Sequence, residues 1–206
     1  QMLSSGASLT EATAHIAQHM GIQHTIAPMS NDPVHTIVHC DQGDLAFQHY
    51  FVRERCEPKV SGFSFSGIHQ AHLNPLLKSW LSDCDGVIIC PSNPFVSVDP
   101  LLQLDGFGEA LKNLPVVAVS PIVGGIAIKG PAAKMLQEMN MPATAVAVAD
   151  HYHGLIDGFV VDADDKKLIE QINVPTISTP SVMVTLQDRI DLAKTCVDFL
   201  TTLSAP

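Results

Sequence analysis

Short, uninterrupted apolar runs alternate with amphipathic segments over the last two-thirds of the chain. The apolar runs predict buried strands at 86–90, 116–119, 145–149, 159–161 and 175–178. The amphipathic segments predict helices at 71–81, 99–111, 132–139, 166–172 and 186–203. Strands that are apolar throughout and alternate with helices are typical of a parallel sheet covered on both faces. We therefore predict a doubly wound, Rossmann-like α/β domain over residues 67–206, with 86–90 and 116–119 as neighbouring parallel strands in its interior.

The first 66 residues follow a different pattern. A helical segment at 9–20 ends at Gly21, a residue that commonly caps helix C-termini. Two strand-like segments follow at 36–39 and 45–52, and the turn at 41–44 between them indicates a hairpin. We therefore predict that residues 1–66 form a smaller appendage of helix and antiparallel strands.

Composition and charge narrow the range of functions. The 206 residues are 46% hydrophobic with a formal net charge of −10, so we expect a folded chain that does not bind nucleic acid. No apolar run reaches the length of a membrane span, and no signal peptide is recognisable, so we expect no membrane partner. The five cysteines lack CxxC spacing, which favours a reducing, cytoplasmic location over a disulfide framework.

In doubly wound sheets, ligands bind beyond the carboxyl ends of the strands. The loop after strand 86–90 carries Ser92, Asn93 and Ser97, which offer hydrogen-bonding groups, and Pro94, which stiffens the backbone. We predict that these four residues contact a ligand. The alternative is a simple turn in which a side chain such as Ser97 caps the following helix.

The loop after strand 116–119 has the composition of an anion site. Ser120 begins it, and the glycine pair that follows allows a ligand to approach the backbone closely. Lys129 adds a positive charge just before the next helix, although the alternative is a solvated lysine beside a glycine turn. The spacing is not that of a Walker A loop. The predicted ligand-binding residues of this loop are Ser120, Gly124, Gly125, Lys129 and Gly130.

Histidines occur in two closely spaced pairs, which raises the question of a metal site. His151 and His153 follow segment 145–149, and His15 and His19 lie one helical turn apart. Neither pair is accompanied by the cysteine or HExxH spacing of a metal centre. We interpret both pairs as polar surface features and predict no metal ligands among them.

Several motifs occur together in an order that resembles the 2-phospho-L-lactate transferase family. They are PMSNDPV at 28–34, FQHYFVR at 47–53, PSNP at 91–94, SPIVGG at 120–125 with KGP at 129–131, and HY at 151–152 with DGFVVD at 157–162. Each run is short, but the ordered set covers nearly the whole chain. The resemblance adds Gln48, Arg53, His151 and Tyr152 as further candidate substrate-binding residues.

The resemblance implies a reaction in coenzyme F-420 biosynthesis. Family members transfer a phospholactyl-type group from a guanosine diphosphate-linked donor, phospholactate or a related phosphorylated acid, to the ribityl hydroxyl of a deazaflavin precursor, and GMP leaves. The expected cofactor is magnesium, the expected partners are these small molecules, and a homodimer is one expected assembly. Positioning and charge neutralisation would supply most of the catalysis.

The chain also departs from the family pattern. The family's N-terminal glycine-rich turn and its metal-binding acidic pair have no counterpart here, so we expect a C-terminal two-thirds that is inactive alone. Asn31 and His35 replace the usual Asp and Arg, and Ile126 replaces a common Lys, which leaves the donor acid open. The alternative is a regulatory protein of the same fold, of the gluconeogenesis or cell-wall morphogenesis type, that binds a nucleotide-like ligand without catalysis.

Overall fold

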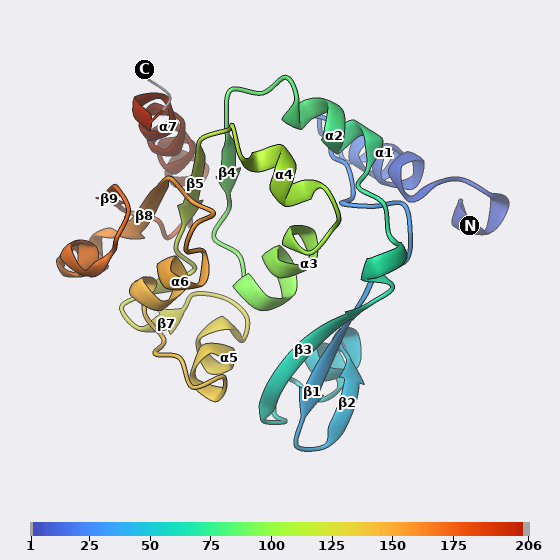
Figure 1. Cartoon of the computed structure of the whole chain (residues 1–206), viewed down its shortest axis with the longest axis horizontal. Coiled ribbons are helices and arrows are strands. Elements are labelled where there is room, and N and C mark those ends of the chain that lie inside the picture. Colours follow the sequence, from blue (N-terminus) through green and yellow to red (C-terminus); the bar gives the residue numbers. More distant parts are fainter. Residues whose placement is uncertain (1, 204–206) are drawn as a thin grey trace.

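A four-stranded parallel sheet forms the centre of the computed structural model, which describes residues 2–203 (Figure 1). The strands run in the order β4-β5-β8-β9. Their bounds are Val87–Ile89 for β4, Val116–Val119 for β5, Gly158–Asp162 for β8 and Thr176–Thr179 for β9. The predicted pairing of 86–90 with 116–119 is confirmed, since Ile88 lies opposite Val117 in a parallel register. The predicted interior position is confirmed for 116–119, which pairs with β4 and β8, and is wrong for 86–90, because β4 forms an edge of the sheet as described.

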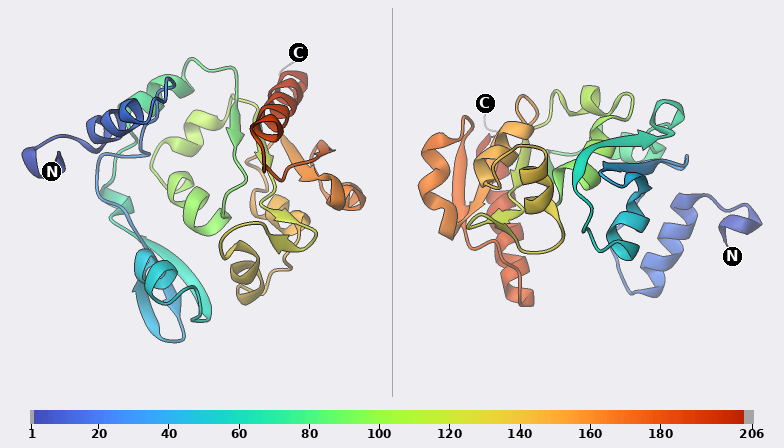
Figure 2. Two further views of the ribbon diagram at one scale, coloured as in Figure 1. Left: turned by 180° about the vertical axis from the view of Figure 1, so that it is seen from behind. Right: turned by 90° about the horizontal axis from the view of Figure 1, so that it is seen from below.

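Helices cover both faces of this sheet, which confirms the predicted α/β fold. On one face, Val117 and Val119 pack with Leu192 and Cys196 of α7 (Leu186–Leu203). On the other face, Val116 and Ala118 belong to a larger buried cluster that includes residues of α4 and α6. Figure 2 shows α7 on one side of the sheet and α5 and α6 on the other. The other helices of this part are α2 (Pro75–Leu81), α3 (Asp99–Leu102), α4 (Phe107–Leu111), α5 (Ala132–Glu138) and α6 (Ala145–His151).

Three shorter elements complete the α/β part. A π-helix, Pro94–Val98, joins β4 to α3. A hairpin of β6 (Ile122–Val123) and β7 (Ile126–Ala127) follows β5. A 3₁₀-helix, Ala163–Gln171, joins β8 to β9. Among residues 2–203, no helix is both long enough and apolar enough to cross a membrane.

The first third of the chain forms the predicted helix and antiparallel sheet. α1 (Leu9–His19) is followed by β1 (His35–Cys40), β2 (Gly43–Ala46) and β3 (Val60–Ser66), in the order β2-β1-β3. Short 3₁₀-helices span Leu3–Ser5 and Ile68–Gln70. The large buried cluster continues into this region through Val38, Tyr50 and Phe65. The division of the chain after residue 66 stays a prediction.

Lys134 of α5 ties the appendage to the rest of the molecule. Its Nζ atom donates to the carbonyl of Pro58 at 2.8 Å and pairs with Glu138 at 2.7 Å. Glu138 makes a second contact with the appendage, because its carboxylate also accepts a hydrogen bond from the Val60 amide at 2.9 Å. The appendage is therefore anchored directly to a helix of the α/β part.

The segment at 145–149, predicted as a strand, is the helix α6. The Thr144 hydroxyl accepts a hydrogen bond from the Ala147 amide and caps the helix N-terminus. Alternating alanine and valine satisfy the pattern of a buried strand, but alanine is also the best helix former, and burial on several sides removes the helical periodicity. An apolar run of this length does not distinguish the two structures.

The strand predicted at 45–52 is also partly wrong. β2 ends at Ala46, and His49–Arg53 is a π-helix that buries Tyr50 completely. Phe47 and Phe51 stack at 5.6 Å between ring centroids, a contact made possible by the helical turn between them. The aromatic residues of this segment are typical of a strand, but the helical turn is what places Tyr50 in the core.

Two further elements differ from the prediction. The strand β3 was not predicted. The helix predicted at 99–111 is divided into α3 and α4 by Gly106, whose φ is 79°.

Candidate functional site

A cavity of about 150 Å³ lies at the carboxyl ends of the parallel strands. Loops after β4, β5 and β9 and the start of α5 form its walls. We call it the strand-end cavity. Its polar lining residues are Asn93, Ser120, Lys129 and Ser181, and its apolar ones are Pro91, Pro121, Val123, Ile128, Ala132, Val182 and Met183.

Three of the predicted site residues, Asn93, Ser120 and Lys129, therefore meet in one cavity, although they belong to loops about 30 residues apart in sequence. The other six predicted residues of these loops lie outside its lining. Pro94 is buried, Ser92 is partly buried, and Ser97, Gly124, Gly125 and Gly130 are exposed.

The side chain of Asn93 is held by contacts within the protein. Its Oδ1 atom accepts a hydrogen bond from the Phe95 amide at 3.1 Å and caps the π-helix, while Nδ2 donates to Met135 Sδ at 3.1 Å. A side chain does cap the helix that follows this loop, but it is Asn93 and not Ser97, and the ligand role of the loop stays a prediction. Asn93 lines the cavity and also stabilises the loop that carries it.

Ser120 is buried, and its hydroxyl is already used. It donates to the Ile122 carbonyl at 2.9 Å and accepts from the Ile122 amide at 3.1 Å. This local turn starts the β6–β7 hairpin. Ser120 therefore contributes to the shape of the cavity more than to its hydrogen-bonding capacity.

The glycine pair forms the turn of the β6–β7 hairpin. Gly124 and Gly125 have φ values of 57° and 82°, and two-residue hairpin turns with positive φ at both positions favour glycine. The Gly124 amide donates to Asp165 Oδ2 at 2.9 Å. A structural turn explains both glycines, the Gly124 amide is occupied, and neither glycine lines the strand-end cavity, so their contact with a ligand stays a prediction.

Ser181 was not predicted as a site residue. Its position depends on a contact with Asp162, which does not line the cavity. Asp162, at the end of β8, accepts hydrogen bonds from the Ser181 amide at 2.7 Å and the Ser181 hydroxyl at 2.8 Å. It also accepts from the Asp164 amide at 3.0 Å. Burial raises the pKa of Asp162, but these hydrogen bonds outweigh it and leave the pKa below its ordinary value. In the sequence, the only signal for this contact is the group of acidic residues at 162–165, at the end of the apolar strand β8.

The candidates added by the resemblance lie elsewhere. Gln48 and Arg53 are exposed on and beside the π-helix of the appendage, outside the lining of the strand-end cavity. His151 Nε2 lies 2.8 Å from Asp99 Oδ1, which joins α6 to the start of α3. Tyr152 is buried, and this burial, with the nearby Asp99 charge, raises the pKa of its hydroxyl. His151 contacts Phe95 and Asp99, which follow Asn93 in the chain, and neither His151 nor Tyr152 lines the cavity.

The charge of the lining favours an anion. Lys129 is its one charged residue, and none of the lining side chains described is a carboxylate. Magnesium prefers carboxylate oxygens, so the lining does not fit a magnesium ion. Across residues 2–203, no three His, Cys, Asp or Glu side chains are grouped so that they could hold a metal ion.

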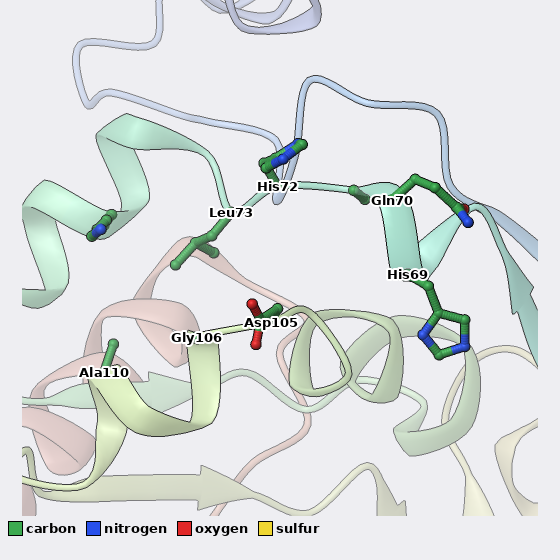
Figure 3. Close-up of a pocket in the computed structure, with 9 residues that line it drawn as sticks. His69, Gln70, His72, Leu73, Asp105, Gly106 and Ala110 are labelled. Carbon is green, nitrogen blue, oxygen red and sulfur yellow. The ribbon is translucent and has the colours of Figure 1, made fainter.

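A second recess, of about 590 Å³, lies between the segment before α2 and the start of α4 (Figure 3). We call it the lateral cleft. Asp105 lies across it from His72, and Lys78 also lines it. The His72 ring is 89% exposed and contacts Asp32 at 2.9 Å. Hydrogen bonds from the His72 backbone and ring lower the pKa of Asp32.

Comparison with known proteins shows sequence similarity over most of the chain. The family model described as "2-phospho-L-lactate transferase CofD" matches residues 1–192. The 2-phospho-L-lactate transferase of Methanosarcina barkeri is 33% identical over 99% of this chain and 67% of its own length. That of Methanosarcina mazei is 36% identical over 80% of this chain and 54% of its own length. The chain thus spans between about half and two-thirds of these relatives.

Solved structures share the fold at lower sequence identity. Protein BH3568 from Bacillus halodurans, described as a member of the upf0052 family, superposes with TM-scores of 0.66 and 0.65 in two crystal structures. The sequence identity is 15–16%, over 95% of this chain and 69% of that one. At this identity the likeness concerns the fold alone.

Proposed function

The chain belongs to the 2-phospho-L-lactate transferase CofD family, and from this premise we propose that its strand-end cavity binds the phosphorylated acid group of the transferase donor. The observation that carries the proposal is the lining itself. Lys129, Asn93 and Ser181 meet at the carboxyl edge of a parallel sheet, with no carboxylate among the lining residues. A cation beside hydrogen-bonding groups is the arrangement that attracts a compact anion.

The size of the cavity decides which part of the reaction belongs there. Sites for ligands of drug size measure roughly 300–1,000 Å³, whereas this cavity measures about 150 Å³. A tricyclic deazaflavin with its ribityl chain is too large for it, and a phosphorylated three-carbon acid is small enough. We therefore assign the cavity to the phosphorylated acid group of the donor and not to the deazaflavin.

The proposed reaction is a phosphoryl transfer. The ribityl hydroxyl oxygen attacks the phosphorus that carries the lactate or related acid, and the bond between that phosphorus and the GMP phosphate breaks. The hydroxyl proton is released, and GMP leaves with the electron pair of the broken bond. Lys129 would oppose the charge of the phosphorylated acid, and the second N–H of the Asn93 amide would orient it, while Ser181, whose amide and hydroxyl donate to Asp162, would shape the wall beside it. Magnesium stays an expectation for the activity, and no step is assigned to it here because the lining residues do not fit it.

Calorimetric titration tests the binding proposal directly. We expect the 206-residue chain to bind 2-phospho-L-lactate and to bind L-lactate, which lacks the phosphate, far more weakly. Equal binding of both acids, or binding of neither, would contradict the assignment of the cavity.

Turnover separates an enzyme from a regulator. A mixture of magnesium, deazaflavin precursor and guanylated phospholactate is expected to release GMP when the full-length protein is added. A complete protein that binds the donor but never releases GMP would favour the regulatory alternative. For the 206-residue chain alone we expect no release. A homodimeric assembly and a cytoplasmic location stay predictions.

A further inference from the structure

Two walls of the strand-end cavity are held by carboxylates that do not line it. The wall formed by Ser181, Val182 and Met183 is fixed through Ser181, whose amide and hydroxyl both donate to Asp162 Oδ2 at 2.7 and 2.8 Å. Asp162 itself is 5% exposed. Because three hydrogen bonds converge on this buried carboxylate, the position of the wall depends on a single side chain.

The β6–β7 hairpin, which supplies Val123 to the cavity and leads into Ile128, is fixed from the same segment. Its turn amide, that of Gly124, donates to Asp165 Oδ2 at 2.9 Å. Asp165 is 4% exposed. A buried carboxylate that receives a backbone amide is a strong, charge-assisted contact, so it holds the exposed turn in one position.

The two carboxylates are three residues apart at the start of one 3₁₀-helix. Asp162 caps this helix, its Oδ1 accepting from the Asp164 amide, and Asp165 lies within its first turn. Asp162 is the extended residue just before the helix and Asp165 belongs to its first turn, so both carboxylates come from one short segment. The short segment after β8 can therefore reach both walls at once.

We propose that Asp162 and Asp165 are positioning residues that set the distance between these two walls, each acting on one wall. They stand behind the lining, so they shape the cavity without placing a negative charge on its surface. The structural part of this inference does not depend on the ligand. Its consequence for affinity rests on the proposed function, because it assumes that the donor acid occupies the cavity.

The test compares Asp162→Asn and Asp165→Asn with Asp164→Asn. Asp164 belongs to the same segment and is exposed, so the control removes the same charge without removing an anchor. Amide hydrogen exchange reads each wall separately. We expect Asp162→Asn to speed exchange in peptides covering 178–185, Asp165→Asn to speed it in peptides covering 120–128, and the control to change neither.

Affinity for 2-phospho-L-lactate supplies the second measurement. Loss of a partner behind a metal-ligating residue typically weakens affinity about 10–100-fold, and we expect the lower end of this range, about tenfold, in both anchor variants and no change in the control. Local exchange that rises without any loss of an existing affinity would overturn the positioning role, as would exchange that rises no more in the anchored wall than in the rest of the sheet, or exchange that changes in neither wall. If the unsubstituted chain does not bind the acid, the proposed function is wrong, while the exchange pattern still decides whether each carboxylate holds its wall.

Discussion

The strand-end cavity and the lateral cleft are both recessed, but they are built differently. The larger one, the lateral cleft, is lined by exposed side chains such as His69, His72 and Lys78. The smaller one also has exposed lining residues, Lys129 among them, but two of its walls are held by buried carboxylates, Asp162 and Asp165. Volume alone would select the cleft.

The difference shows which property marks a site that can orient a ligand. Burying a polar group costs free energy unless the group is hydrogen-bonded. Several satisfied hydrogen bonds behind one surface therefore hold the residues of that surface in defined positions. Exposed side chains such as that of His72 keep most of their rotamer freedom and would have to lose it on binding. We therefore place the function in the strand-end cavity, and four predictions test the contrast.

The largest expected effect is on stability. Asp162→Asn turns one carboxylate oxygen into an amide donor that faces either the N–H and O–H donors of Ser181 or the N–H donor of Asp164. Leaving such buried donors unsatisfied costs about 1–3 kcal/mol. We expect the free energy of unfolding in urea to fall by that amount at pH 7, whereas Asp105→Asn in the lateral cleft should change it by less than about 0.5 kcal/mol.

Acid should remove this difference. The pKa of Asp162 in the folded protein is below its ordinary value, which is about 3.9 in an unfolded chain. Its carboxylate therefore adds stability that is complete above about pH 4 and is lost as the pH falls through the lower folded pKa. The gap between wild type and Asp162→Asn should stay constant from pH 7 to about pH 4 and shrink below it. A gap that persists unchanged below pH 3 would show that the charge is not its cause.

The second prediction compares one lysine from each recess. Lys129→Ala should weaken binding of 2-phospho-L-lactate about tenfold, because a charge-assisted contact to phosphate contributes about 1.5 kcal/mol or more. Lys78→Ala removes the same charge from the lateral cleft and should leave the affinity unchanged. The reverse result in calorimetry would move the site to the lateral cleft.

The third prediction separates the two roles of Asn93. Asn93→Ala removes the cap of the π-helix and should lower stability by about 1 kcal/mol, in addition to weakening binding. Asn93→Asp keeps an oxygen for the Phe95 amide but places a negative charge in the cavity. It should retain stability to within about 0.5 kcal/mol in thermal melts and still lose affinity for the phosphorylated acid. Unchanged affinity in Asn93→Asp would mean that Asn93 is only a structural cap.

The smallest effect is expected in the lateral cleft. His72→Ala removes a ring that is 89% exposed and pairs with Asp32 at the surface. Exposed pairs contribute about 0–1 kcal/mol, so stability should barely change, and binding of the phosphorylated acid should not change at all. A clear loss of affinity in this variant would give the lateral cleft a role that its exposed side chains do not suggest.

The sequence alone indicated the α/β fold, the appendage and three residues of the cavity. Apolar runs such as 116–119 report burial on both sides, and ligand sites of parallel sheets lie at strand ends, so Asn93, Ser120 and Lys129 were within reach of a pattern argument. Patterns of burial do not distinguish a strand from a helix that is buried on several sides, which is why 145–149 was predicted wrongly.

Only the tertiary structure decided which polar groups are free to meet a ligand. The glycine pair and the Ser120 hydroxyl had suitable chemistry, but their partners, Asp165 and Ile122, are visible only once the chain is folded. Ser181 entered the cavity through a contact with Asp162, 19 residues earlier. The type of a residue determines which hydrogen-bond donors and acceptors it has. The folded geometry determines which of these groups are already bonded within the protein.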